Sequence, residues 1–146
     1  MPNKITLFKD DNGYLSNFYP CTVVLDDVEY PSVEHAYQAA KTSDPQMRQK
    51  IKEATTPGKA KRMGKGLKLN MSVPAWNVVK VAIMYDLVKQ KFSKEPFRTG
   101  LIDTGDAELI EGNWWGDTFW GVSYGKGENN LGKILMLVRE ELRAQE

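Results

Sequence analysis

The stretch from residue 116 to 132, GDTFWGVSYGKGENNLG, places an acid–aromatic cluster just before a turn rich in glycine, lysine and asparagine. Asn129 or Asn130 can cap the helix that follows, whose N-terminal amides would face an anion. Glycines let a backbone approach a bound group closely and lysines supply positive charge; here they are Gly125, Gly127, Gly132, Lys126 and Lys133. The turn therefore predicts a phosphorylated ligand, with a capped helix after a surface loop as the simpler interpretation.

Acidic and aromatic residues lie directly upstream of this turn: Asp117, Phe119, Trp120 and Tyr124. Aromatic rings offer stacking surfaces for a flat ligand, and a carboxylate can exchange protons with it. The cluster favours a site that stacks a ring and handles protons.

A second group of polar residues has helical spacing. Glu34, Gln38 and Lys41 stand at i, i+4 and i+7, which places them on one stripe of a helix. Such a stripe is either solvated or catalytic. Glu34 lies in the first turn, where the helix dipole favours the ionised form, so it suits a base, a nucleophile or a stabiliser of positive charge. Lys41 could bind phosphate, pair with Glu34 or act as an amine nucleophile.

Asp117 is the second carboxylate of interest. Paired with Glu34 across a cleft, it would give the two-acid arrangement of glycoside hydrolysis, although the sequence does not fix their separation. Trp76 is either a core anchor or a pocket wall, and Lys80 follows it by one turn on the same face. In the segment Leu15-Ser16-Asn17-Phe18, Asn17 could bind a base or ribose or serve its own backbone.

The remaining pattern predicts the elements that position these residues. Ile5–Phe8 reads as a short strand, 23–30 as two strands joined at Asp26-Asp27, and Glu108–Glu111 as another strand. Helices are expected after Ser32 to about Lys41, after Asp44-Pro45, after Thr56-Pro57, from Ser72 to near Phe92, over 96–102, and from Leu131 onward. We predict a single α+β domain over 1–146, mostly helical with a small β-sheet.

Composition narrows the possible functions. Twenty Lys and Arg against nineteen Asp and Glu give a net charge of +1, which offers no broad field for gripping a nucleic-acid backbone. One histidine and one cysteine disfavour a zinc site, and the single histidine, His35, is expected to be structural. No membrane span or secretion signal is visible, so we expect a cytoplasmic protein that needs neither metal nor cofactor.

Taken in order, these residues resemble the NADAR superfamily, the YbiA-like N-glycosidases. The resemblance covers nearly the whole chain and rests on the segments Gly13–Phe18, Tyr30–Lys41, Thr55–Pro57 with Ala60 and Gly64, Trp76–Lys80, Lys91-Phe92, Leu101–Gly105, Leu109–Glu111, Asp117–Gly121, and Gly125–Gly127 with Asn129, Leu131 and Gly132. Trp114-Trp115-Gly116 departs from the family pattern, where a more polar segment is expected.

The resemblance implies hydrolysis of the bond between ribose C1 and a nitrogen in phosphorylated ribosyl or ADP-ribosyl compounds. Two substrate classes are associated with the family, namely early pyrimidine intermediates of riboflavin synthesis and guanine bases that carry ADP-ribose. Carried over, Glu34, Lys41 and Asp117 become catalytic candidates, and Trp76 and Trp120 become ring-stacking walls. The other substrate-binding candidates are Ser16, Asn17, Lys80, Gly125, Lys126, Gly127, Asn129 and Asn130.

Two chemical routes fit these residues without a metal. In one, Glu34 stabilises positive charge at C1 and Asp117 protonates the leaving nitrogen. In the other, the ribose ring opens and Lys41 forms a Schiff base at C1. The alternatives to the pyrimidine substrate are an ADP-ribosyl glycohydrolase acting on guanine in nucleic acid and a non-catalytic ADP-ribose or NAD sensor. The sequence leaves the oligomeric state open.

Overall fold

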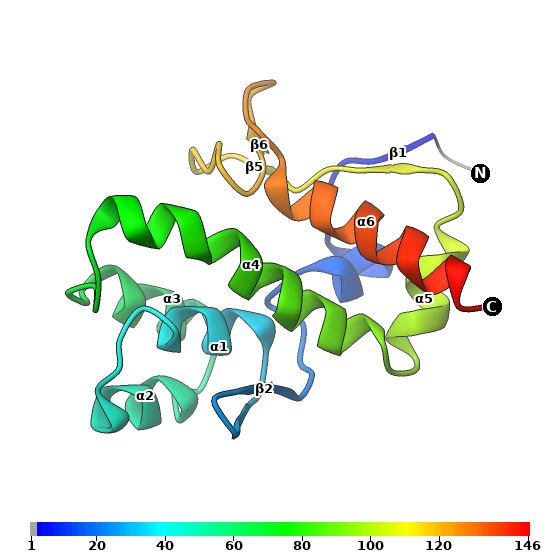
Figure 1. The fold of residues 1–146 in the computed structure, drawn as a ribbon. Helices are drawn as coiled ribbons and strands as arrows, with labels where there is room; N and C mark the ends of the chain where they lie inside the picture. The colour runs from blue at the N-terminus through cyan, green and yellow to red at the C-terminus, as the bar shows by residue number, and fades with distance from the viewer. Residues whose placement is uncertain (1–2) are drawn as a thin grey trace. The chain divides into compact units, whose positions relative to one another are not determined.

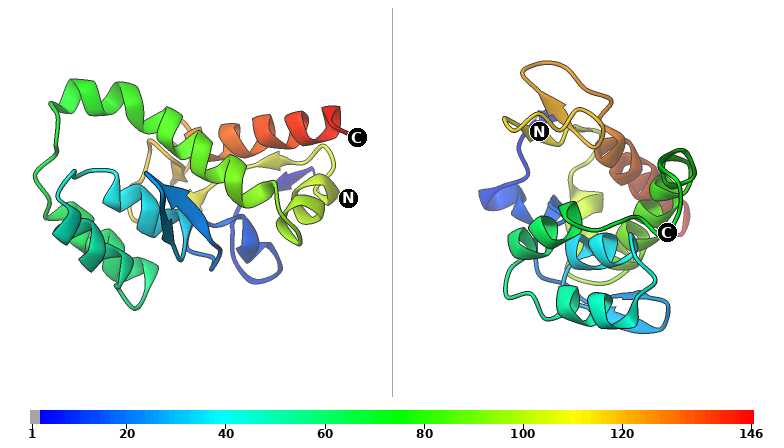
Figure 2. Two further views of the ribbon diagram at one scale, coloured as in Figure 1. Left: turned by 60° about the horizontal axis from the view of Figure 1, so that its bottom comes forward. Right: turned by 90° about the vertical axis from the view of Figure 1, so that its left-hand side faces the viewer.

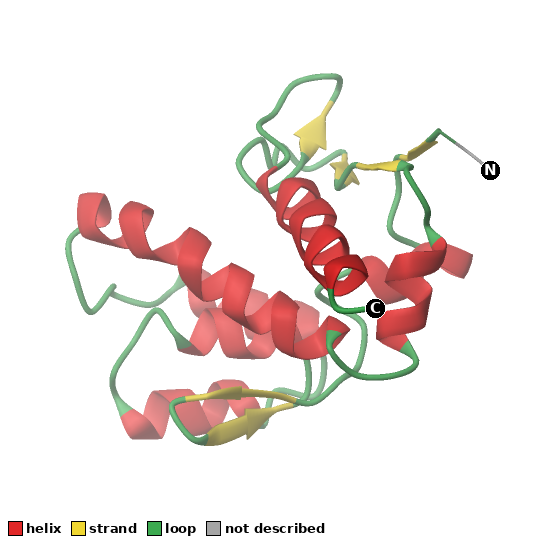
Figure 3. Ribbon diagram, turned by 45° about the vertical axis from the view of Figure 1, so that its right-hand side comes forward, coloured by secondary structure: helices red, strands yellow, loops and turns green. Residues whose placement is uncertain are grey.

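The computed structural model describes residues 3–146, which divide into two compact units. Asn17–Lys91 form the continuous unit, and residues 3–16 with Phe92–Glu146 form the discontinuous unit. Helices dominate, and strands occur only as short pairs (Figures 1 and 3). The mostly helical α+β class is confirmed, but three two-stranded pairs take the place of one small sheet. That residues 1–146 form a single domain stays a prediction.

The continuous unit begins with a hairpin and continues with helices. Its strands β2 (Val23–Leu25) and β3 (Val28–Tyr30) are antiparallel, and α1 contacts this hairpin as well as α2 and α3 (Figure 2). The helices are α1 (Val33–Ala39), α2 (Pro45–Lys52), α3 (Pro57–Lys65) and α4 (Val73–Phe92). Every predicted helix of this unit is confirmed, although α1 ends two residues before Lys41.

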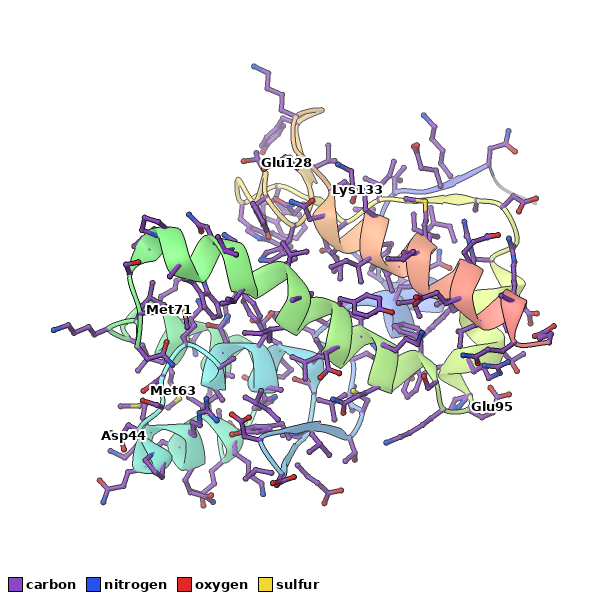
Figure 4. The ribbon with its side chains drawn as sticks, viewed as in Figure 1. Asp44, Met63, Met71, Glu95, Glu128 and Lys133 are labelled. Carbon is purple, nitrogen blue, oxygen red and sulfur yellow. The ribbon has the colours of Figure 1, made fainter. Side chains whose placement is uncertain are left out.

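The helix starts of this unit follow from side-chain caps. Each cap oxygen accepts a hydrogen bond from a backbone N–H of the first turn, which would otherwise lack a partner. Proline occupies the first helical position of both α2 and α3, where no N–H is needed. The cap and donor pairs are Ser32 with His35, Asp44 with Gln46 (Asp44 is labelled in Figure 4), and Thr56 with Lys59.

The hairpin turn is built from the predicted aspartate pair. Asp26 and Asp27 have φ angles of 49° and 67°, the left-handed conformation that two-residue hairpin loops of type I′ require. Gln90 of α4 holds the hairpin from the side, because its amide accepts from the Val24 N–H at 2.7 Å and donates to the Val24 carbonyl at 2.9 Å.

The discontinuous unit is organised around the closing helix α6 (Asn130–Ala144). Apolar residues at helical spacing along α6 are buried, namely Leu131, Ile134, Leu135, Val138 and Leu142. The other elements are β1 (Lys4–Ile5), a 3₁₀ helix η1 (Asp10–Leu15), α5 (Phe97–Asp103), β4 (Glu108–Leu109), β5 (Gly112–Asn113) and β6 (Val122–Ser123). Pairs β1–β4 and β5–β6 are parallel. No helix within residues 3–146 is both long and apolar enough to cross a membrane.

Two predicted strands are shorter than expected. Strands β1 and β4 pair over only two residues each, because the Gly112 N–H bonds the Ile110 carbonyl in a tight turn that ends the ladder. The predictions for Thr6–Phe8 and Ile110-Glu111 as strand are therefore wrong, and the short pair β5–β6 and helix η1 were not predicted.

Lys91 is a fully buried cation near the end of α4. Its side chain is 1% exposed, and its ammonium lies 5.8 Å from the centroid of the Tyr19 ring. Burial lowers the pKa of Lys91 to about 8, and Cys21 opposes that shift. Because burial disfavours the charged form, protonated Lys91 costs folding free energy at neutral pH.

We expect the stability difference between Lys91→Met and the wild type to depend on pH. The folded pKa lies below the unfolded one, so the unfolded chain binds more protons between pH 8 and about 10, and wild-type stability rises with pH across that window. At about 1.4 kcal/mol per pKa unit, the advantage of Lys91→Met at pH 7 should shrink by up to ~3 kcal/mol by pH 10. Urea unfolding of both proteins at pH 7 and at pH 10 measures this difference in the free energy of unfolding. Lys50→Met, on the exposed face of α2, is the control and should give a constant difference.

Candidate functional site

Glu34 and Gln38 form a buried polar pair on α1. Glu34 is 8% exposed and Gln38 is 4% exposed, and Gln38 Nε2 donates to Glu34 Oε2 at 2.5 Å. The Glu34 N–H donates to the Asn17 carbonyl at 3.1 Å, which ties the first turn of α1 to the segment before the hairpin. The stripe is thus not a solvated face, since the Glu34 carboxylate is held by a neighbour one helical turn away.

The contact between α1 and α3 fixes Gln38. A Cβ at Gly64 would overlap the Gln38 side-chain amide, so Gly64 is required for this close approach. Gln38 Oε1 is buried without a hydrogen-bond partner among the described residues. One turn earlier on α1, His35 Nε2 donates to the Ala54 carbonyl at 3.0 Å, and its Nδ1 lies 2.6 Å from Ser32 Oγ. The structural role predicted for His35 is confirmed.

Lys41 lies just past the end of α1, in a turn where its N–H bonds the Gln38 carbonyl. Its ammonium lies 5.5 Å from the centroid of the Tyr37 ring. Burial lowers the pKa of Lys41; the nearby Glu34 carboxylate raises it, while Lys80, Lys61 and Lys65 lower it further. The net result is an ammonium that gives up its proton more readily than an ordinary lysine.

An aromatic pair lies beside Lys41. The Tyr37 and Trp76 rings are 5.7 Å apart at their centroids and tilted by 42°. Trp76 is only 5% exposed, so most of its ring serves the core. Lys80 follows one turn later on α4, and its charge reaches Lys41. The Asn17 side chain is 3.4 Å from the Met84 sulfur, to which its amide donates.

Asp117 organises its own loop in the discontinuous unit. Its Oδ1 accepts from the backbone N–H groups of Phe119 and Trp120, at 3.2 and 2.9 Å. Asn113 clamps the same residue from the other side, because its side chain pairs with both the N–H and the carbonyl of Asp117. A proton delivered by Asp117 would therefore be carried on Oδ2. The Trp120 ring packs edge-on against Phe119 at 4.8 Å.

The turn before α6 differs from the predicted anion cradle. Ser123 and Lys126 exchange both backbone hydrogen bonds around Tyr124-Gly125, whose φ angles of 52° and 79° again fit a two-residue hairpin loop. The close approaches made possible by glycine are to the protein itself. A Cβ at Gly127 would meet the Gly121 carbonyl, and one at Gly132 would meet the Leu109 carbonyl.

The first amides of α6 are also engaged. The N–H groups of Asn130 and Leu131 donate to the carbonyls of Phe119 and Trp120, at 3.1 and 3.0 Å. Asn129 is the N-cap residue, but its side chain bridges Leu109 and Glu111, and the Asn130 side chain bonds Phe119. Asn129 is thus the N-cap residue, as one of the two predicted candidates, but it makes no side-chain cap hydrogen bond. The N–H groups of Asn130 and Leu131 are bonded within the protein and do not face an anion. Figure 4 labels Glu128 and Lys133 on either side of this helix start.

The structure thus sorts the candidates by unit. The continuous unit brings together Asn17, Glu34, Lys41, Trp76 and Lys80. The discontinuous unit holds Ser16, Asp117, Trp120, Gly125, Lys126, Gly127, Asn129 and Asn130. Among residues 3–146, no group of three or more His, Cys, Asp or Glu side chains is placed to hold a metal ion.

Three residues near Lys41 were missed from the sequence as site candidates: Tyr37, Lys61 and Lys65. The signal for the two lysines was present, because the short helix α3 reads PGKAKRMGK and carries its positive charges close to two small residues. The small residues Ala60 and Gly64 allow α3 to pack closely against another element. Lysines on the same helix then lie beside that contact.

Comparisons with known proteins identify the family of this chain. Residues 6–143 match the NADAR domain model. The chain is 36% identical to the N-glycosidase YbiA of Escherichia coli (91% of this chain, 83% of that protein) and 39% identical to an N-glycosidase of Nostoc punctiforme (90% and 86%). It is 38% identical to a riboflavin biosynthesis protein of Vibrio vulnificus over 92% of this chain, and it spans 36% of that protein. The NMR structure of E. coli YbiA superimposes with a TM-score of 0.84 at 33% identity, covering 99% of this chain and 88% of that one. The chain belongs to the NADAR domain family.

Proposed function

We propose that this chain is an N-glycosidase that hydrolyses the N-ribosyl bond of phosphorylated ribosyl pyrimidines formed in riboflavin synthesis. The reaction class, hydrolysis of an N-glycosidic bond, is that of the relatives from E. coli and Nostoc punctiforme. The substrate class draws support from the relative in Vibrio vulnificus, which is named a riboflavin biosynthesis protein.

The observation that carries the proposal is the pairing of a buried carboxylate with an amine of lowered pKa. Glu34 is held by Gln38, and Lys41 lies within electrostatic reach of Glu34 beside the Tyr37 and Trp76 rings. Cleavage of an N-ribosyl bond develops positive charge at C1, which a fixed carboxylate stabilises. An amine that loses its proton readily can attack the same carbon.

The proposed roles follow from this chemistry. Glu34 and Lys41 act at C1, and Asp117 donates a proton to the leaving nitrogen through Oδ2. Within the continuous unit, Trp76 stacks on a flat ring of the substrate, Asn17 binds the ribose and Lys80 contacts the phosphate. Ser16 and Trp120 of the discontinuous unit are proposed as further substrate-binding residues. The turn that holds Gly125, Lys126 and Gly127, followed by Asn129 and Asn130, is the second candidate region for the phosphate, with the Lys126 side chain as its positive charge.

Incubation with two substrates tests the function. The purified chain is given the ribosylaminopyrimidine phosphate and, separately, DNA bearing ADP-ribosylated guanine, and release of base or ADP-ribose is followed by chromatography. We expect release of the pyrimidine. Release of ADP-ribose alone would establish the ADP-ribosyl glycohydrolase instead. Binding of ADP-ribose or NAD without turnover of either substrate would favour a sensor.

A further inference from the structure

Three lysines and the Glu34 carboxylate lie within electrostatic reach of the Lys41 ammonium in the continuous unit: Lys61, Lys65 and Lys80. Two of them, Lys61 and Lys65, are one turn apart on α3 and therefore lie on one face. Between them is Gly64, the residue packed against Gln38 of α1. These lysines thus flank the contact that holds Gln38, the hydrogen-bond partner of Glu34.

Contacts with aromatic rings locate Lys61 and Lys41. Lys61 Nζ lies 6.0 Å from the centroid of the Phe18 ring, and Phe18 follows Asn17, whose carbonyl accepts from the Glu34 N–H. Lys41 Nζ lies over the Tyr37 ring, which contacts Trp76, one turn before Lys80. Lys61 and Lys65 therefore approach Lys41 from α3, and Lys80 approaches it from α4. These four residues are here called the lysine cluster.

The charge balance at this point is strongly positive. One carboxylate, Glu34, and three lysines act on the Lys41 ammonium. Like charges brought together repel each other, and a bound anion relieves that repulsion while gaining charge-assisted hydrogen bonds. A phosphate monoester carries close to two negative charges at neutral pH, so it would offset most of the excess of four lysines over one carboxylate.

We propose that the lysine cluster is the phosphate subsite of the proposed glycosidase, with Lys61 and Lys65 contacting the phosphate while Lys41 and Glu34 reach C1 of the same ribose. This inference rests on the proposed function for the ribosyl part of the ligand. We place the phosphate at the lysine cluster and not at the turn before α6, because the N–H groups of Asn130 and Leu131 in that turn already donate to carbonyls of the protein.

Calorimetric titration of the full chain tests the subsite without turnover. The probes are ribose 5-phosphate, inorganic phosphate and unphosphorylated ribose at fixed ionic strength. The Lys61→Ala/Lys65→Ala double variant should lose at least about tenfold in affinity for ribose 5-phosphate and phosphate, because charge-assisted contacts are lost. Affinity for ribose should not change. Alanine suits an exposed helix, and a Lys61→Gln/Lys65→Gln variant removes the charges while keeping most of the side-chain length.

Lys59→Ala is the matched control. Lys59 lies on the same helix, but its Nζ bonds Thr55 Oγ1 at 2.8 Å, and its removal should leave all three affinities unchanged. Lys126→Ala tests the competing turn before α6, where a phosphate contact would appear as a loss of phosphate affinity confined to that variant. A loss confined to Lys126→Ala, an equal loss for Lys59→Ala, or a wild type that does not bind ribose 5-phosphate would overturn the subsite.

The two proposals fail in different ways. A wild type that binds ribose 5-phosphate through Lys61 and Lys65 but releases base from neither N-ribosyl substrate keeps the subsite and rejects the glycosidase. An active wild type whose KM for the phosphorylated substrate is the same in the double variant keeps the glycosidase and rejects the subsite.

Discussion

Glu34→Gln is expected to fold normally and to lower kcat by at least about a hundredfold. Glutamine keeps the size of the side chain and an oxygen that can accept from Gln38 Nε2, so the packing of α1 on α3 should persist. What is lost is the negative charge that would stabilise the cationic C1, and loss of such a charge-stabilising or proton-transferring group commonly costs this much. Steady-state release of the pyrimidine measures the effect.

Two comparisons make this result specific to Glu34. Glu53→Gln changes an exposed carboxylate at the end of α2 and should leave kcat unaltered. Binding of ribose 5-phosphate to Glu34→Gln should be preserved or strengthened, because a negative charge near the lysine cluster has been removed. If Glu34→Gln turns over at the wild-type rate, the carboxylate is a structural partner of Gln38 and nothing more.

The helices of the continuous unit could be predicted from the sequence because their signals are local. Ser32, Asp44 and Thr56 each precede a helix and supply the cap oxygen, and a proline follows two of them. A cap oxygen bonds an amide only two or three residues away, so the pattern carries its own geometry. The two-strand hairpin was predictable for the same reason, since Asp26 and Asp27 alone set its turn.

The turn before α6 could not be predicted because one of its glycines packs against a residue that is distant in the sequence. Gly132 approaches the Leu109 carbonyl, and Asn129 bridges Leu109 and Glu111, about twenty residues away. In the sequence, a glycine needed for packing looks the same as one needed for a ligand. The role proposed for Lys61 and Lys65 needed the structure for a related reason: the sequence shows their charges but not which face of α3 packs against Gln38.

Lys41 is the residue at which two mechanisms predict different results. In the covalent route, the ribose ring opens, the Lys41 amine attacks C1, the bond from C1 to the base nitrogen breaks, and that nitrogen leaves with a proton. Water then hydrolyses the resulting imine, which returns the free amine and the sugar phosphate. In the two-carboxylate route, Lys41 remains protonated and only orients the phosphate or pairs with Glu34.

The surroundings of Lys41 favour the covalent route. Attack requires the unprotonated amine, and burial together with Lys80, Lys61 and Lys65 lowers the pKa of Lys41 against the opposing effect of Glu34. Activity that depends on the free amine should rise with pH below the range of an ordinary lysine. Removing Lys61 and Lys65 removes two positive charges that repel the Lys41 ammonium, so the pKa of Lys41 should rise. The ascending limb of the kcat profile should then move to higher pH.

Borohydride added during turnover should therefore trap the imine as a stable secondary amine. We expect a mass increase of one reduced ribosyl phosphate on the peptide that contains Lys41 and no such increase on the peptide that contains Lys80. Lys41→Arg should abolish both the adduct and activity, because guanidinium stays protonated and cannot attack, although it preserves the positive charge. A Lys41→Arg protein that stays active, with no adduct under rapid turnover of the wild type, would instead require Glu34 and Asp117 to carry the reaction, since charge alone at position 41 would then be sufficient.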